Sequence, residues 1–417
     1  MTTEREINLV IPQEGLVDIP AGPEDQLVHQ QAASGLEIED VESEELLINM
    51  GPQHPATHGV LRVVLRTDGE VVLEAVPHIG YLHRCAEKIG ENVAYYQYLP
   101  YTDRMDYVAG MNENWAFCEA VEKLADIQVP RRAEFIRVII GELQRIASHL
   151  VTFGTYGMDI GAFTPFLYAF REREYILDLF EMVCGARLTY SYYTIGGVTH
   201  DFPTGYLEKV SEFLDYFEPK VKEYNDLLSY NHIFVKRTAD VGVLTEKMAI
   251  DYACTGPVLR GSGLPYDLRR DKPYSVYPEL DFEVCVGSGE QGTVGDSWDR
   301  YFVRMLEMVQ SCKIIRQCIK MMPDVSDNPE TGGKHRVKLP RNFKPKAGEV
   351  FVELENPRGT LGFFVESQGG AQPYRVKARA GTFCNLSALG PLSENVLIGD
   401  MPAIIGSIDI VMGQVDR

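Results

Sequence analysis

The stretch "RRAEFIRVIIGELQRIASHLVTFG", Arg131 to Gly154, decides the fold that we expect for this chain. Its apolar residues recur at intervals of three and four, which is the period of a helix with a buried face. The preceding stretch, Val108 to Ile127, has the same period, and Pro130 separates the two. The sequence therefore predicts a bundle of long helices in the middle of the chain.

Further helical patterns follow toward the C-terminus. Thr164-Pro165 is a hydroxyl N-cap followed by an N1 proline, and it introduces a third helix. We expect three more helices at about 204–230, 245–254 and 297–322. A Gly-, Pro- and Tyr-rich excursion separates the last two, and it is too long for a simple connection.

Strand patterns flank the helices on both sides. Leu61 to Gly80 predicts a hairpin, because two β-branched runs are separated by Asp68-Gly69. The runs "EVFVELEN" and "LGFFVES" predict strands near the C-terminus. The expected fold class is therefore α+β and mainly α. It combines a central long-helix bundle, an N-terminal β-hairpin or small sheet, and a C-terminal β-containing section.

Four parts are expected along the chain. They are an acidic flexible arm (1–46), an N-terminal β subdomain with a candidate site loop (47–108), the helical bundle (109–325), and a basic linker with a C-terminal α/β section (326–417). The arm holds twelve Asp or Glu against one Arg, so it carries most of the net charge of −20. It either lies on a basic partner or is a solvated tail. The rest is only mildly acidic, which argues against nucleic acid as the main ligand.

The cysteines and the apolar stretches exclude several classes of protein. None of the eight cysteines forms a Cys-x-x-Cys pair, which argues against a zinc ribbon or an iron–sulfur cluster held by this chain alone. We expect reduced thiols in a cytoplasmic setting. The best candidate for a membrane span, Val151 to Phe170, contains Asp159, three glycines and Pro165, so it matches a lipid-facing helix poorly.

Two histidines stand out in "NMGPQHPATHGV", Asn49 to Val60. His54 and His58 are four residues apart, and on a helix they would face one metal ion. Pro52 and Pro55 make a helix here very unfavourable, so the interpretation as a metal motif is weak. A stiff loop remains. It either presents a histidine at its surface, or both imidazoles bind backbone in a tight turn.

A single carboxylate is the second candidate. Between Arg145 and Arg171, only His149 and Asp159 can carry charge near neutral pH. A buried carboxyl group holds its proton tightly, which makes Asp159 a candidate proton donor or half of a carboxylate–imidazole pair. The alternative is that Asp159 caps a helix or a turn.

Tyrosines gather just before the first long helix, among them Tyr107 next to an Arg104/Asp106 pair. A phenol set in an apolar wall is suited to grip a carbonyl group. Most tyrosines are nevertheless half-buried packing residues.

Together these stretches resemble one family, the 49-kDa-type (D-type) subunit of respiratory complex I, the proton-pumping NADH:quinone oxidoreductase. The resemblance runs from about Leu46 to Arg417 and rests on "NMGPQHPATHGVLR", "YTDRMDY", "TPFLYAFRERE" and the closing "DIVMGQVDR". It implies a fold like that of the [NiFe] hydrogenase large subunit. It also implies a cavity for a quinone head group, shared with a neighbouring subunit that carries a [4Fe–4S] cluster. The substrate would be ubiquinone or menaquinone, with no metal or cluster bound by this chain alone.

The resemblance assigns roles to five residues. Tyr107 would donate a hydrogen bond to one quinone carbonyl, and His58 would face the other. Asp159 would pair with His58 and take part in proton coupling. Arg84 would approach the partner's cluster. Thr189 stands where many members have a cluster-adjacent histidine, so we expect a weaker pH dependence of the cluster potential, which would suit menaquinone.

The resemblance also implies partners and a location. The partners would be the [4Fe–4S]-bearing quinone-site subunit, the 30-kDa-type (C-type) subunit and the membrane subunit at the quinone entrance. The chain would be a peripheral protein on the cytoplasmic side of the bacterial inner membrane and inactive alone.

Two other functions are weighed against this one. A hydrogenase large subunit would need two Cys-x-x-Cys pairs to hold nickel and iron, and this chain has none. A purely structural scaffold would not need His58, Tyr107 and Asp159 together.

Overall fold

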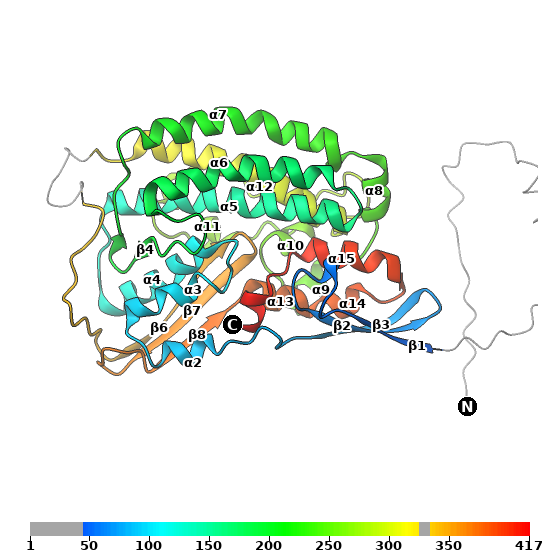
Figure 1. Cartoon of the computed structure of the whole chain (residues 1–417), viewed down its shortest axis with the longest axis horizontal. Helices are drawn as coiled ribbons and strands as arrows, with labels where there is room; N and C mark the ends of the chain where they lie inside the picture. The colour runs from blue at the N-terminus through cyan, green and yellow to red at the C-terminus, as the bar shows by residue number, and fades with distance from the viewer. Residues whose placement is uncertain (1–44, 325–333) are drawn as a thin grey trace, which may run out of the picture. The chain divides into compact units, whose positions relative to one another are not determined.

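The computed structural model describes residues 45–324 and 334–417, and the range 45–417 forms one compact unit. Within this unit, long helices form a layer over small antiparallel sheets (Figure 1). The expected α+β, mainly α class is confirmed. The expected acidic arm at 1–46 lies outside the described residues except for Glu45 and Leu46, which begin the first strand.

The bundle is built from long helices that follow the predicted ranges closely. Their bounds are α4 (Gly110–Ala125), α5 (Arg131–Asp159), α6 (Thr164–Cys184), α7 (Tyr206–Tyr224) and α12 (Ser297–Met321). Helix α5 is buried along almost its whole length and contacts both α6 and α12, so it is the central helix. One detail of the prediction is wrong. Phe163, rather than Thr164, occupies the N-cap of α6, and no side chain caps this helix.

Shorter helices connect these elements. The α-helices among them are α2 (Ala86–Gly90), α3 (Leu99–Thr102), α8 (His232–Thr238), α9 (Glu246–Asp251), α10 (Gly256–Gly261), α11 (Leu268–Asp271), α13 (Gly381–Ser387), α14 (Leu389–Leu392), α15 (Met401–Ile408) and α16 (Met412–Asp416). The 3₁₀ turns are η1 (Pro55–Thr57), η2 (Tyr95–Gln97), η4 (Tyr277–Glu279) and η5 (Ile398–Asp400). One π-helical turn, η3 (Asn225–Ser229), follows α7.

Three antiparallel sheets complete the described fold. Their orders are β1–β2–β3–β9, β4–β5 and β6–β7–β8, with bounds β1 (Glu45–Met50), β2 (Arg62–Asp68), β3 (Val71–His78), β4 (Tyr193–Thr194), β5 (Gly197–Val198), β6 (Gly348–Asn356), β7 (Gly359–Ser367), β8 (Arg375–Arg379) and β9 (Val396–Leu397). The predicted hairpin is formed by β2 and β3, which pair antiparallel with Leu65 opposite Ala75. Strand β9 comes from near the C-terminus, so both ends of the described chain share one sheet.

Two hydrophobic clusters hold the unit together. The larger fills the bundle, and the smaller lies between the N-terminal sheet and the C-terminal helices. Helix α15 belongs to the smaller cluster and packs against both α5 and η1. The end of α5, the η1 loop and the C-terminal segment therefore meet, and the candidate site lies where they meet.

Candidate functional site

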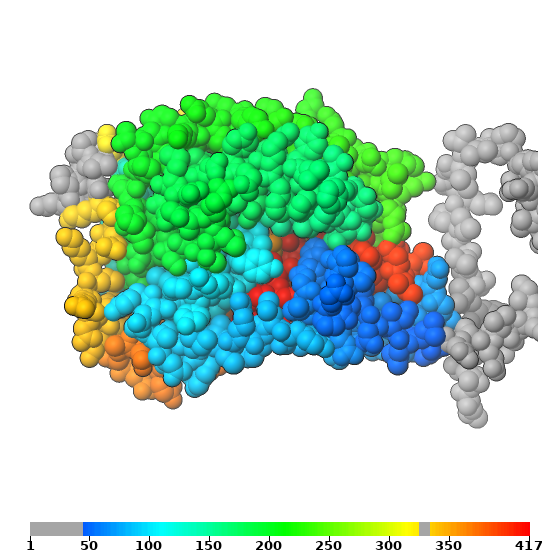
Figure 2. Space-filling model, viewed as in Figure 1, coloured from blue at the N-terminus to red at the C-terminus, as the bar shows by residue number. Residues whose placement is uncertain are grey.

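A cavity of about 480 Å³ opens where these three segments meet. Figure 2 shows a recess in this region, with the C-terminal segment (red) at its floor and the N-terminal residues (blue and cyan) along its rim. Its lining comprises His54, Pro55, Ala56, His58, Tyr107, Val108, Val151, Thr155, Met158, Asp159, Arg358, Pro402, Asp409, Ile410 and Val411. The walls are mostly apolar, with a few polar groups, which is the usual character of a pocket for a small organic molecule.

His58 and Asp159 meet at one side of this cavity. The Nε2 atom of His58 lies 2.5 Å from Oδ2 of Asp159, and both side chains are largely buried, with 12% and 7% exposed. The contact is an ion pair when the imidazole is protonated, and when the imidazole is neutral its N–H donates a hydrogen bond to the charged carboxylate. Residues 101 positions apart in the sequence thus form one hydrogen-bonded pair.

The loop around η1 fixes the position of His58. His54 lies at the N-cap of this turn, and its Nδ1 accepts a hydrogen bond from the Ala56 N–H at 3.2 Å. This bond confirms the structural interpretation of His54, although the ring also borders the cavity. His58 closes the turn in the left-handed conformation, with φ of 46°. That conformation is unfavourable for a residue with a side chain, and the surrounding turn maintains it.

The end of α5 fixes the position of Asp159. Asp159 is the last residue of this helix, and its carboxylate contacts His58, so the structure shows the expected carboxylate–imidazole pair rather than the alternative of a helix cap. Gly406 in α15 faces this point closely: a Cβ atom there would lie 2.9 Å from Oδ2 of Asp159 and 2.6 Å from the Tyr156 ring. A glycine at position 406 therefore leaves room for the carboxylate.

Tyr107 borders the same cavity. Its side chain is 40% exposed, and among the described residues its hydroxyl has no hydrogen-bond partner. Burial raises the pKa of this phenol above its ordinary value, although the nearby Arg358 acts in the opposite direction. Tyr107 therefore remains a protonated donor near neutral pH, and a ligand can accept its hydrogen bond.

A buried arginine lies behind Tyr107. Arg358 Nη1 donates to both carboxylate oxygens of Asp106 at 3.1 and 3.0 Å and to Ser148 Oγ at 3.0 Å. Its Nη2 donates to Asp409 Oδ1 at 3.2 Å, and its Nε donates to the Asp409 carbonyl oxygen at 3.1 Å. Asp106, next to Tyr107 in the sequence, is thereby fixed to the cavity wall.

This arrangement corrects one expectation and adds residues that sequence reasoning missed. Asp106 pairs with Arg358 rather than with Arg104, which donates to the Pro100 carbonyl oxygen. Nothing in the sequence marked Arg358, because it sits in the short turn between β6 and β7, where a charged residue usually faces water.

Arg84 and Thr189 lie outside this cavity. Arg84 Nη2 donates to the Arg104 carbonyl oxygen at 2.5 Å. Thr189 lies two residues before Ser191, whose backbone N–H and hydroxyl both donate to Asp103 Oδ2. The structure therefore places Arg84 beside Arg104 and the Thr189–Ser191 segment near Asp103, and neither Arg84 nor Thr189 lines the cavity of His58 and Asp159.

The described residues contain neither a metal-binding cluster nor a helix that could cross a membrane. No group of three or more His, Cys, Asp or Glu side chains within 45–324 and 334–417 is arranged to hold a metal ion. In the same ranges, every helix is too short or too polar to cross a bilayer.

Comparison with known proteins decides the family. Residues 159–417 match the family model described as the 49 Kd subunit of respiratory-chain NADH dehydrogenase. The chain belongs to this family. The family expected from the sequence motifs is thus confirmed.

Three relatives support the same membership. The chain is 56% identical to the D-type subunit of NADH-quinone oxidoreductase from Chlorobium luteolum over 91% of its own length and 95% of the relative's. It is 55% identical to the protein of the same name from Chlorobaculum tepidum and 54% identical to that from Prosthecochloris aestuarii, each over 91% of this chain and 94% of the relative. Members of the 49-kDa family with this name therefore align with nearly the whole chain.

Proposed function

We propose that this chain is the quinone-binding subunit of an NADH–quinone oxidoreductase and that the 480 Å³ cavity receives the quinone head group. One observation carries the proposal: Tyr107, His58 and Asp159 border one largely apolar cavity. The sequence motifs that contain them are far apart in the chain, so a common cavity is a specific outcome of the fold.

The chemistry of quinone reduction matches these side chains. Reduction to quinol adds two electrons and two protons, and negative charge develops on the two carbonyl oxygens before they are protonated. Tyr107 would donate a hydrogen bond to one oxygen, because fixed donors stabilise charge that develops beside them. His58 would protonate the other oxygen, and the second proton would come from the Tyr107 hydroxyl, which water then reprotonates. The electrons would come from a [4Fe–4S] cluster in the neighbouring subunit.

Proton transfer from His58 would change the electrostatics of the pair. Once the imidazole is neutral, the largely buried Asp159 carboxylate loses its cationic partner. An unpaired charge in a buried site is unfavourable, so a conformation of the surrounding segments that relieves this charge would become favoured. We propose this step as the link between quinone chemistry and proton translocation.

The partners follow from the same proposal. The cluster-bearing subunit would cover the surface near Arg84 and Thr189, and the 30-kDa-type (C-type) subunit and the membrane subunit at the quinone entrance would contact other faces. Phe163, at the N-cap of α6, and Leu167, within α6, are both more than half exposed, which supports coverage by another protein. The chain would then lie on the cytoplasmic side of the bacterial inner membrane, with menaquinone favoured by Thr189.

Asp159→Asn tests the proposal. The change keeps the shape of the side chain but removes the charge that faces His58, so we expect quinone reduction by the assembled complex to fall by about ten-fold or more. NADH oxidation with an artificial acceptor should persist. Asp178→Asn on the exposed part of α6 is the control. Equal quinone reduction in the Asp159→Asn variant and the control would contradict the assigned role of Asp159.

A further inference from the structure

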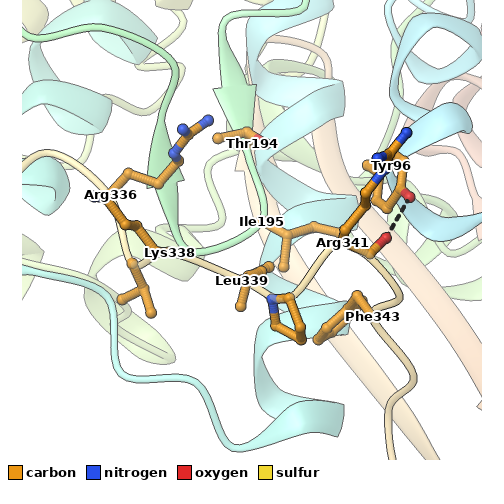
Figure 3. Close-up of a pocket in the computed structure, with 10 residues that line it drawn as sticks. Tyr96, Thr194, Ile195, Arg336, Lys338, Leu339, Arg341 and Phe343 are labelled. Carbon is orange, nitrogen blue, oxygen red and sulfur yellow. Dashed lines mark hydrogen bonds between the residues drawn. The ribbon is translucent and has the colours of Figure 1, made fainter.

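A second cavity, of about 640 Å³, lies away from the quinone site. Residues 336–341 and Phe343 form one side of it, and Tyr96, Thr194 and Ile195 form the other. Figure 3 shows Arg336 and Arg341 at opposite ends, with Ile195 and Leu339 between them and Phe343 below Arg341. The cavity therefore has an apolar floor and a cationic rim.

The cationic rim belongs to a longer cationic segment, residues 336–346. From 334 to 340, exposed residues alternate with half-buried ones, as in an extended strand with one face on the protein. Val337 and Leu339 face inward. The exposed cations are Arg336, Lys338, Arg341, Lys344 and Lys346.

These five cations lack ion-pair partners among the described residues. Elsewhere, exposed cations of this acidic protein commonly find a carboxylate, as Lys88 and Arg375 both do with Glu91. No Asp or Glu occurs between Glu330 and Glu349 in the sequence, so the positive charge is not balanced locally. The segment is a cationic strip on a chain whose net charge is −20.

The backbone of the cationic segment is also only partly paired. Val337 N–H donates to the Gly196 carbonyl oxygen at 2.8 Å, and Val198 N–H donates to the His335 carbonyl oxygen at 3.0 Å. Beyond this anchor, the Tyr96 hydroxyl donates to the Arg341 carbonyl oxygen at 3.1 Å. Successive N–H groups of an extended strand point to opposite sides, so the Lys338 N–H points away from the bond between Val337 and Gly196. Within the described chain this N–H has no partner, so an extended peptide can pair with it.

We infer that the cationic segment and its cavity bind an extended acidic peptide segment of a neighbouring subunit. Its carboxylates pair with Arg336, Lys338 and Arg341, its backbone pairs with the free Lys338 N–H, and one apolar side chain enters the cavity over Ile195. The narrow strip and the acidic remainder of the protein favour a peptide over nucleic acid, whose phosphates need a broad cationic face. The inference rests on the proposed function only in taking the chain to be one subunit of a complex.

Site-specific cross-linking in the purified, assembled complex tests this inference. A photoreactive benzoylphenylalanine is placed at Lys338, the complex is irradiated, and the joined peptide is sequenced by mass spectrometry. We expect one main adduct, with a segment of another subunit that is rich in Asp and Glu. An adduct with a neutral or basic segment, with lipid or with nucleic acid overturns the inference, and so does the absence of any adduct.

Charge reversal shows whether the cations hold that segment. The triple variant Arg336→Glu, Lys338→Glu and Arg341→Glu should lower the yield of the same adduct, formed from a photoreactive residue at Leu339, by about five-fold or more. Reversal of three exposed lysines elsewhere, at Lys222, Lys236 and Lys247, should leave the yield unchanged. Equal yields in both variants overturn the role of charge. If no other protein is purified together with the chain, the proposed function fails instead, so the two failures are distinct.

Discussion

Tyr107→Phe is expected to lower the rate of quinone reduction by the assembled complex by about one to two orders of magnitude. The change removes a single hydroxyl, which has no hydrogen-bond partner among the described residues and is free to donate to a ligand. The ring and the apolar walls remain, so quinone still enters. In the unmodified protein this hydrogen bond strengthens as charge develops on the quinone oxygen. Its loss should therefore lower kcat more than it raises KM.

A neighbouring tyrosine supplies a matched control for this result. Tyr101 is 39% exposed, close to the 40% of Tyr107, but it does not border the cavity. Tyr101→Phe should reduce quinone at the normal rate. In both variants NADH oxidation with an artificial acceptor should be normal, which verifies assembly. Full quinone reduction with Tyr107→Phe would show that this hydroxyl does not act on the substrate.

Arg358→Met is expected to have the largest effect on stability. The variant leaves Asp106 buried without its cation, and breaking a buried ion pair in this way costs about 3–5 kcal/mol of unfolding free energy. Asp409 retains a second arginine, Arg304, at 3.6 Å, so most of the loss should come from Asp106. Urea unfolding followed by the fluorescence of the buried Trp115 and Trp298 measures this loss.

Two comparisons make the result specific. Arg375→Met removes a half-exposed arginine paired with Glu91, and this should cost no more than about 1 kcal/mol. Adding Asp106→Asn to Arg358→Met should restore part of the stability, because a neutral amide is less costly to bury than an unpaired carboxylate. The stability difference between Arg358→Met and the unmodified protein should also become smaller as the pH falls. Burial already raises the pKa of Asp106, so at lower pH this carboxyl group is protonated, and a neutral acid costs less to bury than a carboxylate. A deficit as small as that of Arg375→Met would contradict the account.

The elements that the sequence predicts well are those with a local cause. Helix α5 follows from the period of its apolar residues, and the β2–β3 hairpin follows from Asp68-Gly69. Strand β9 could not be predicted, because two residues carry no usable period and only pairing with β3 makes them a strand. The N-cap of α6 was misplaced by one residue because the position of Pro165 fits either start.

The candidate site depends on long-range contacts, so local patterns reveal only parts of it. The prolines argued against a long helix through His54 and His58, and a three-residue 3₁₀ turn lies between them, but the prolines did not indicate Asp159 as the partner of His58. That partner came from the family resemblance, and the distance of 2.5 Å is a property of the fold. Arg358 had no local signal at all, since its partners Asp106 and Asp409 lie 252 and 51 residues away.

The central claim is that the cavity bordered by Tyr107, His58 and Asp159 receives the quinone head group. The most direct measurement is photolabelling of the assembled complex with a quinone that carries an azide on its head ring, followed by mapping of the labelled peptides. The account predicts adducts on this chain at cavity residues such as Val151 and Val411, suppressed by excess unlabelled quinone. Specific labelling confined to other subunits, or to parts of this chain away from the cavity, would contradict it.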